Sequence, residues 1–97
     1  MHYVYILLSK KDKKFYTGST NNLQKRIKRH NEGLVKATRY RRPLKLIYCE
    51  ACLNRKDSMR REIYLKTSWG KHFLKNRLSN FLKEIKERSR LSSARHT

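Results

Sequence analysis

The sequence predicts a small α/β fold in which a three-stranded sheet is flanked by helices, in the order β-β-α-β-α-α. Three observations lead to this class. An early run is apolar on both faces, a later run alternates, and the remaining apolar residues recur at helical spacing. The chain has 97 residues, so we expect one domain over residues 1–88, followed by a basic, flexible tail over residues 89–97.

Three segments are predicted as strands. His2–Ser9 carries apolar side chains on both faces, which favours a central position in the sheet. After a polar turn over Lys10–Lys14, the short segment Phe15–Ser19 forms a hairpin with the first strand. Leu44–Ala51 alternates well enough to be the third strand.

The first predicted helix follows the N-cap candidates Thr20–Asn22 and runs to about Glu32. Gly33 stands where a left-handed C-terminal cap favours glycine. We expect an apolar stripe on this helix, made of Leu23, Ile27 and Leu34.

The second predicted helix runs from about Asn54 to Lys66, with Met59 and Ile63 on its buried face. We expect Thr67–Gly70 to end this helix. A last helix follows, because apolar residues recur there at helical spacing: Phe73, Leu74, Leu78, Phe81, Leu82 and Ile85.

The strongest feature of the composition is its charge. Twenty-six Lys and Arg against seven Asp and Glu give a formal charge of +19, and a polyanion relieves the repulsion within such a chain. Nucleic acid is the commonest such partner, whereas a basic surface that only contacts solvent or ribosomal RNA is the alternative. The basic side chains that we expect at a nucleic-acid surface are Arg39, Arg41, Arg42, Lys71 and Lys75.

Other classes of protein are less compatible with the sequence. The apolar run Val4–Leu8 is too short to cross a membrane, and no signal peptide is recognisable at the N-terminus. Cys49 and Cys52 supply at most half of a zinc site, so we interpret them as reduced thiols without a disulfide. We therefore expect a cytoplasmic protein, and a monomer because its charge opposes self-association.

Two residues of the first helix are candidates for a functional site. His30 falls on the apolar stripe, and Arg26 stands one turn before it. An arginine beside a buried stripe is costly unless an anion meets it, and a guanidinium binds two phosphate oxygens at once. Alternatively, the stem of Arg26 packs on the sheet with its head in water, and His30 is a hydrogen-bonded residue at the edge of the core.

Glu62 and two tyrosines complete the candidate set. Glu62 either pairs with Lys66 one turn later or ligates a divalent cation through oxygen. Tyr5 and Tyr16 lie on the two strands of the predicted hairpin. We expect the surrounding positive charge to lower the pKa of these tyrosines, which would make a tyrosine base plausible.

The order of these residues resembles the GIY-YIG nuclease family, in particular its small stand-alone bacterial members. The chain has Tyr3-Val4-Tyr5 and then Tyr16-Thr17-Gly18. An arginine comes ten residues after Tyr16, a histidine four residues later, and a glutamate lies on the next helix. The resemblance implies an antiparallel sheet flanked by helices and metal-dependent hydrolysis of a DNA phosphodiester.

The resemblance also implies a role for each candidate residue. Tyr5 and Tyr16 would be the motif tyrosines, one of which helps to deprotonate the attacking water. Arg26 would bind the scissile phosphate, and His30 would orient the phosphate or the water. Glu62 would hold a single Mg²⁺ or Mn²⁺.

One departure from the family pattern concerns Ser19, which stands where several nuclease relatives have a lysine. Our leading hypothesis is a DNA endonuclease that selects structure rather than sequence, with RNA not excluded as a substrate. The alternative is a non-catalytic nucleic-acid-binding protein on the same fold. A protein-interaction module on a nucleoprotein particle is a third possibility.

Overall fold

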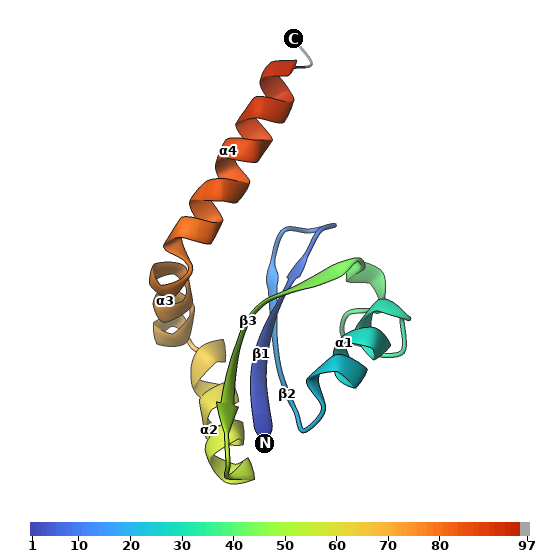
Figure 1. The fold of residues 1–97 in the computed structure, drawn as a ribbon, viewed down its shortest axis with the longest axis vertical. Coiled ribbons are helices and arrows are strands. Elements are labelled where there is room, and N and C mark those ends of the chain that lie inside the picture. The colour runs from blue at the N-terminus through green and yellow to red at the C-terminus, as the bar shows by residue number, and fades with distance from the viewer. Residues whose placement is uncertain (96–97) are drawn as a thin grey trace.

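The computed structural model describes residues 1–95 and contains a three-stranded antiparallel sheet with helices on both faces (Figure 1). The strands are β1 (His2–Ser9), β2 (Phe15–Thr20) and β3 (Leu44–Cys52), in the spatial order β2-β1-β3. The predicted fold class is confirmed. β1 is central, as its two apolar faces predict, and β2 is an edge strand.

The helices are α1 (Leu23–Asn31), α2 (Arg55–Lys66), α3 (Ser68–Arg77) and α4 (Ser79–Arg95), and a 3₁₀ turn covers Arg39–Arg41. The single last helix of our prediction is therefore two helices, which meet at Leu78. α4 extends away from the sheet (Figure 1) and runs to Arg95, past the predicted end near residue 88. This stretch contains no Gly or Pro to interrupt the helix. Residues 96–97 of the predicted tail lie outside the described residues.

The predicted break at Thr67–Gly70 is correct at Thr67 and wrong at Gly70. Thr67 ends α2 and caps α3, because its hydroxyl accepts a hydrogen bond from the backbone N–H of Gly70 at 3.2 Å. Gly70 lies inside α3, where a Cβ atom would collide with the backbone of Tyr64 and Leu65. Gly70 therefore allows α3 to pass close to the end of α2.

The core is divided between the two faces of the sheet. On one face, Tyr5, Leu7 and Leu44 form a buried cluster against which α1 packs. On the other face, the buried residues Val4 and Ile6 of β1 pack with side chains from α2 and α3. Residues that alternate along β1 therefore belong to separate apolar clusters.

The predicted buried face of α2 is wrong. Met59 is 47% exposed and Ile63 is 66% exposed, whereas Ser58 and Leu65 are each 1% exposed. The apolar residues of α2 do not form a single stripe, so Leu65 faces the sheet while Met59 and Ile63 face outward.

The limits of α1 agree with the predicted caps. The Asn22 side chain accepts a hydrogen bond from the backbone N–H of Lys25, and Gly33 has a φ of +79°. Because this turn redirects the chain, Leu34 lies outside the helix and is 54% exposed. The predicted stripe is therefore wrong at Leu34, and the nearby Val35 is buried instead.

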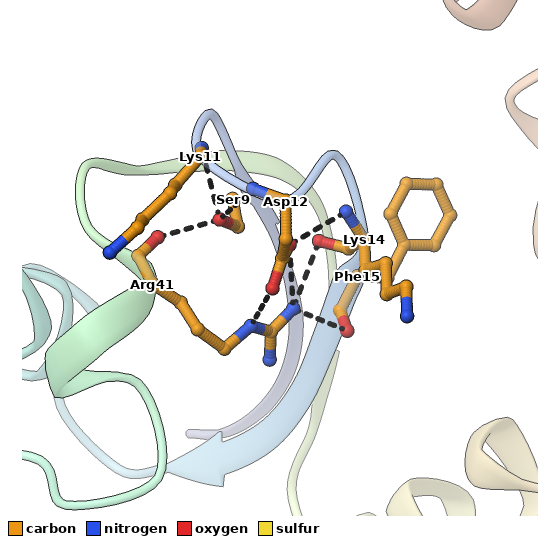
Figure 2. A network of polar contacts seen from close by, with 6 residues as sticks. All are labelled: Ser9, Lys11, Asp12, Lys14, Phe15 and Arg41. Atoms are coloured by element: carbon orange, nitrogen blue, oxygen red, sulfur yellow. Dashed lines mark hydrogen bonds and ion pairs between the residues drawn. The ribbon is translucent and has the colours of Figure 1, made fainter.

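Arg41 joins the loop after α1 to the turn between β1 and β2 (Figure 2). Its Nε donates to Asp12 at 2.6 Å, and its Nη2 donates to the carbonyl oxygens of Lys14 and Phe15 at 3.2 and 3.3 Å. The hydroxyl of Ser9 donates to the carbonyl of Arg41 at 2.6 Å. Hydrogen bonds, first from Arg41 and then from the backbone N–H of Lys14, lower the pKa of Asp12 to about 2. The guanidinium of Arg41 is thus engaged inside the protein.

Cys49 and Cys52 are both free thiols. Among residues 1–95, no helix combines the length and the apolar character needed to cross a bilayer.

Candidate active site

The candidate residues meet beside β2, and those on the α1 face form a hydrogen-bonded chain. The phenolic oxygen of Tyr5 accepts a hydrogen bond from Nε of Arg26 at 3.3 Å and lies 2.8 Å from Nε2 of His30. Tyr5 and His30 are each 0% exposed. His30 therefore lies behind Tyr5 and contacts it, rather than presenting its ring at the surface.

The row of hydrogen-bonded side chains continues to Thr38, which is not among the residues predicted from the sequence. Nδ1 of His30 lies 2.7 Å from Oγ1 of Thr38, which is also 0% exposed. A neutral imidazole has one donor and one acceptor nitrogen, so His30 can link the hydroxyl groups of Tyr5 and Thr38. Thr38 lies in a basic loop. Its role is visible only in the structure, where this loop packs back against α1 and brings Thr38 to His30.

Burial is the largest influence on the pKa values of His30 and Tyr5. Burial, and then the positive charge of Arg26, lower the pKa of His30 to about 4, so the imidazole is neutral at pH 7. Burial also raises the pKa of Tyr5, although the hydrogen bond from Arg26 acts in the opposite direction. For Tyr5, the expected lowering by nearby positive charge is therefore wrong, because desolvation outweighs it.

Tyr16 lies beside the same chain but is partly exposed. Its ring centroid is 6.4 Å from that of Tyr5 and 5.1 Å from that of His30. Gly18 gives Tyr5 its space, because a Cβ at this position would lie 2.5 Å from the Tyr5 hydroxyl oxygen. Tyr5 is thus enclosed, whereas Tyr16 has access to solvent.

Glu62 approaches from α2, on the opposite face of the sheet. Ser19 on β2 donates to its Oε1 at 2.6 Å, and Lys66 donates to its Oε2 at 2.8 Å. Burial alone would raise the pKa of Glu62, but the hydrogen bonds from Lys66 and Ser19 and the charge of Lys66 together lower it. The carboxyl group is therefore ionised at neutral pH.

An open groove of about 700 Å³ joins the two halves of the candidate site. Arg26 and Glu62 both line it, and the end of β2 with the following residue, Ser19 to Asn21, forms part of its wall. An arginine and an ionised carboxylate that share one groove can together receive a phosphate and a divalent cation.

A divalent cation would have Glu62 as its protein ligand. Among the described residues, no three His, Cys, Asp or Glu side chains come together as a preformed cage. Mg²⁺ commonly keeps several waters and binds through one or two carboxylates together with substrate phosphates. An ionised carboxylate at the wall of an open groove fits that manner of binding.

The other predicted nucleic-acid contacts are dispersed. Arg39 and Arg42 line a second cavity, of about 560 Å³, together with the exposed Tyr40. Lys71 lines a third cavity, of about 240 Å³, beside Tyr16 and Lys66. Lys75 is exposed on α3 and lines none of these three cavities.

Comparison with known proteins assigns the sequence of this chain to a family. The family model of the GIY-YIG catalytic domain matches residues 1–77. The UPF0213 protein CPE1444 of Clostridium perfringens is 54% identical over 67 residues, which are 68% of this chain and 71% of that protein. The UPF0213 protein YazA of Bacillus subtilis is 41% identical over 66 residues, which are 67% of this chain and 66% of that protein.

A solved structure is also similar to this chain. The solution NMR structure of the UPF0213 protein BH0048 from Bacillus halodurans has 39% sequence identity and a TM-score of 0.48. The match covers 75% of this chain and 80% of that protein.

Proposed function

We propose that this chain, which belongs to the GIY-YIG family, is a metal-dependent endonuclease that hydrolyses DNA phosphodiester bonds. The observation that supports the proposal is a single groove lined by both Arg26 and Glu62, which come from opposite faces of the sheet. A groove lined by both residues supports the proposal that one substrate contacts a phosphate ligand and a metal ligand together. Family membership supports the class of reaction, since GIY-YIG proteins are generally nucleases.

Arg26 is the proposed ligand of the scissile phosphate. Its Nε donates to Tyr5, and the guanidinium carries further N–H groups that can bind the oxygens of a phosphate in the groove. The anchor on Tyr5 fixes the guanidinium before substrate arrives. A fixed positive charge stabilises the negative charge that develops on the phosphate in the transition state.

Tyr16 is the proposed acceptor of the proton from the attacking water. Tyr5 and Tyr16 are the candidates, and Tyr5 is fully buried with its oxygen already bound to Arg26 and close to His30. Tyr16 is partly exposed, so a water molecule can reach it. In this arrangement Tyr5, His30 and Thr38 position Arg26 and do not contact the water.

Glu62 is the proposed ligand of one Mg²⁺ or Mn²⁺. Ser19 and Lys66 hold the carboxylate, although each of its oxygens keeps a further lone pair for a cation. A divalent ion bound there would neutralise negative charge on the phosphate and the leaving oxygen. Ser19 orients the carboxylate through its hydrogen bond to Oε1.

Selection of substrate structure rather than base sequence follows from the character of the surface. The charge of +19 attracts phosphates of any sequence. Lysines and arginines that contact the phosphate backbone of DNA fix the position of the protein on the DNA, and these contacts do not read the base sequence directly. Duplex, branched and single-stranded DNA are all candidate substrates, and RNA is a further one.

The alternative, a nucleic-acid-binding protein that does not cleave, has one structural observation in its favour. Tyr5 and His30 are 0% exposed, so two of the five predicted catalytic side chains do not reach the solvent in this structure. A protein of this kind would show steep salt dependence of binding without dependence on metal.

The experiment that separates these functions is cleavage of a labelled panel containing duplex, single strand, flap and four-way junction, with Mg²⁺ or Mn²⁺. The wild type is compared with Arg26→Ala, Glu62→Ala and the control Arg29→Ala, which changes an exposed arginine on α1. Identical purification exposes contaminating nucleases. We expect metal-dependent cleavage by the wild type and Arg29→Ala only. A wild type that binds but does not cut, or four proteins that cut alike, would contradict the nuclease.

A further inference from the structure

We infer that α2 forms a binding site for the nucleotides next to the scissile phosphate, with Arg55 contacting a neighbouring phosphate and Met59 and Ile63 contacting sugars or bases. The inference rests on the proposed function, because the scissile phosphate at Arg26 and Glu62 defines the position of the strand. It adds a substrate-binding surface that the sequence did not predict.

The groove follows one face of α2. The α2 residues that line it are Arg55, Ser58, Met59, Glu62 and Ile63. Their spacing is that of a single helical stripe, so they form a continuous wall along two turns. The groove is also lined by His2 at the start of β1 and by Arg26 on α1. A substrate strand can therefore lie along the axis of α2 in this groove.

The length of this wall determines how far the site reaches. Arg55 and Glu62 are seven residues apart on one helix, which corresponds to about 10 Å along the axis. A strand of duplex DNA rises about 3.4 Å per nucleotide, so this length spans about three nucleotides. Arg55 is accordingly placed for a phosphate about three nucleotides from the one that is cut.

Charge and exposure suit these residues to such a contact. The ion pairs among the described residues are Arg41–Asp12, Arg61–Glu50 and Lys66–Glu62, and Arg55 takes part in none of them. Met59 and Ile63 are 47% and 66% exposed, one turn apart and beside the ionised Glu62. Arg55 is suited to bind a phosphate, whereas Met59 and Ile63 are suited to contact sugars and the faces of bases.

Ser58 provides an independent indication that this wall receives a ligand. The residue is 1% exposed, and its hydroxyl is a buried side-chain group without a hydrogen-bond partner among the described residues. Ser58 lines the groove between Arg55 and Glu62. Buried polar groups in folded proteins nearly always have a partner, and rotation of the Ser58 side chain toward the groove would let a phosphate or sugar oxygen supply one.

A protein partner would also cover exposed apolar side chains, but the charge favours a polyanion. The groove contains Arg26 and Arg55 and a single acid, Glu62, in a chain of charge +19. Binding of an acidic partner without nucleotides would depend on the arginines, and it would not depend on Met59 and Ile63. The experiment below separates these cases.

The first arm of the test measures binding without metal, so that it does not depend on cleavage. Fluorescence anisotropy follows a fluorescein-labelled twelve-nucleotide oligothymidylate in EDTA, at several salt concentrations. The variants are Arg55→Ala and the matched control Arg60→Ala, which removes an exposed arginine of α2 outside the groove. We expect Arg55→Ala to weaken binding about tenfold and to reduce the salt slope by roughly 0.7, the value for one phosphate contact on a single strand.

The second arm fixes the position of the contact. The best substrate of the cleavage panel is made with one neutral methylphosphonate at each position in turn. Where the labelled strand is part of a duplex segment, we expect the wild type to lose cleavage when the neutral linkage lies about three nucleotides from the scissile bond. The same linkage is expected to have no further effect in Arg55→Ala, because the charge that it would contact has already been removed.

The apolar contact has its own variant, Met59→Ser combined with Ile63→Ser. Both residues are exposed, so circular dichroism and thermal melting should remain those of the wild type. We expect weaker oligonucleotide binding with an unchanged salt slope, since no charge is removed. Unchanged binding by this variant would overturn the apolar contact.

The outcomes distinguish this inference from the proposed function. Equal loss of affinity in Arg55→Ala and Arg60→Ala would overturn the Arg55 site, whether or not the protein cleaves. A wild type that cuts none of the substrates would remove the nuclease proposal, and the binding arm would still decide the role of Arg55. A methylphosphonate effect that persists in Arg55→Ala would overturn the placement at three nucleotides.

Discussion

The phenolic oxygen of Tyr5 lies 2.8 Å from Nε2 of His30, and neither side chain is exposed to solvent. The sequence places both residues among the candidates for direct contact with substrate. In the structure they are internal, and the chain from Arg26 through Tyr5 and His30 to Thr38 links the groove to the core. The arginine at its outer end is the member of this chain that lines the groove.

The low pKa of His30 should make the protein less stable in acid. An unfolded histidine takes up a proton near pH 6.5, whereas folded His30 does so at about 4. The full contribution is therefore present above pH 6.5, and it is lost as the pH falls towards 4. At roughly 1.4 kcal/mol per pKa unit, the expected loss in unfolding free energy is about 3 kcal/mol, measurable by urea denaturation across this range.

The control for this prediction is a pair of glutamine variants. His30→Gln keeps one donor and one acceptor but does not titrate, so the dependence between pH 6.5 and 4 should flatten. His72→Gln changes an exposed histidine and should leave the dependence as in the wild type. Asp12, with its pKa of about 2, loses its contribution only in more acidic solution. Similar curves for His30→Gln and the wild type would contradict the prediction.

Phenylalanine substitutions should separate the roles of the two tyrosines. If Tyr16 accepts the proton from the attacking water, Tyr16→Phe should lower kcat by about 10²- to 10⁴-fold with little change in KM. Tyr5→Phe removes the partner of Arg26 and His30, so it should raise KM and destabilise the fold by about 1–3 kcal/mol. Steady-state kinetics with thermal melting measure both effects. A larger loss of kcat in Tyr5→Phe would transfer the role of base to Tyr5.

Metal binding should depend on Glu62 and be opposed by Lys66. Glu62→Gln removes the anionic ligand, and we expect it to abolish Mn²⁺ binding in electron paramagnetic resonance titrations without DNA. Lys66→Gln removes a positive charge from the carboxylate, so Mn²⁺ should bind several-fold more tightly at pH 7. The lowered pKa of Glu62 means that binding persists into mildly acidic solution and declines as the carboxylate is protonated.

Glu84→Gln is the matched control for metal binding, because Glu84 is an exposed acid on α4. It should bind Mn²⁺ as the wild type does. Retention of binding in Glu62→Gln would show that the cation binds at another site.

Arg41 should contribute to the stability of the fold and Arg39 to DNA binding, although the two residues lie only two positions apart. Arg41→Ala removes the ion pair with Asp12 and the hydrogen bonds to Lys14 and Phe15, so it should lower Tm by several degrees. Arg39→Ala changes an exposed residue and should leave Tm unchanged while weakening DNA binding. Thermal melting and anisotropy on both variants test this, and an unchanged Tm for Arg41→Ala would contradict it.

The strands could be predicted from the sequence because their patterns are local. His2–Ser9 is apolar on both faces and is the central strand, and Gly33 has the positive φ that its position predicts. The faces of α2 could not be predicted, since two exposed apolar residues, Met59 and Ile63, imitate a buried stripe. Only the packing of α2 on the sheet decides which face is covered.

The candidate site was partly predictable for a similar reason. The spacing of Arg26 and His30 places them on adjacent turns of one helix, and the structure joins both to Tyr5. The partners of these residues, Thr38 and Ser19, come from segments distant along the chain, and a hydroxyl group carries no periodic signal. The pKa of Tyr5 is set by enclosure among other side chains, which depends on tertiary structure.

The division of the site between two faces of the sheet bears on how this protein can change in evolution. Arg26 lies on α1, which packs on the apolar cluster that contains Tyr5. Glu62 lies on α2, which packs on the cluster of the other face of the sheet, with Val4 and Ile6. A substitution at Glu62 would remove the proposed metal ligand and would leave in place the hydrogen bond that anchors Arg26 on Tyr5. A nuclease built in this way can become a nucleic-acid-binding protein by a single replacement, and ancestral reconstruction could recover that transition one residue at a time.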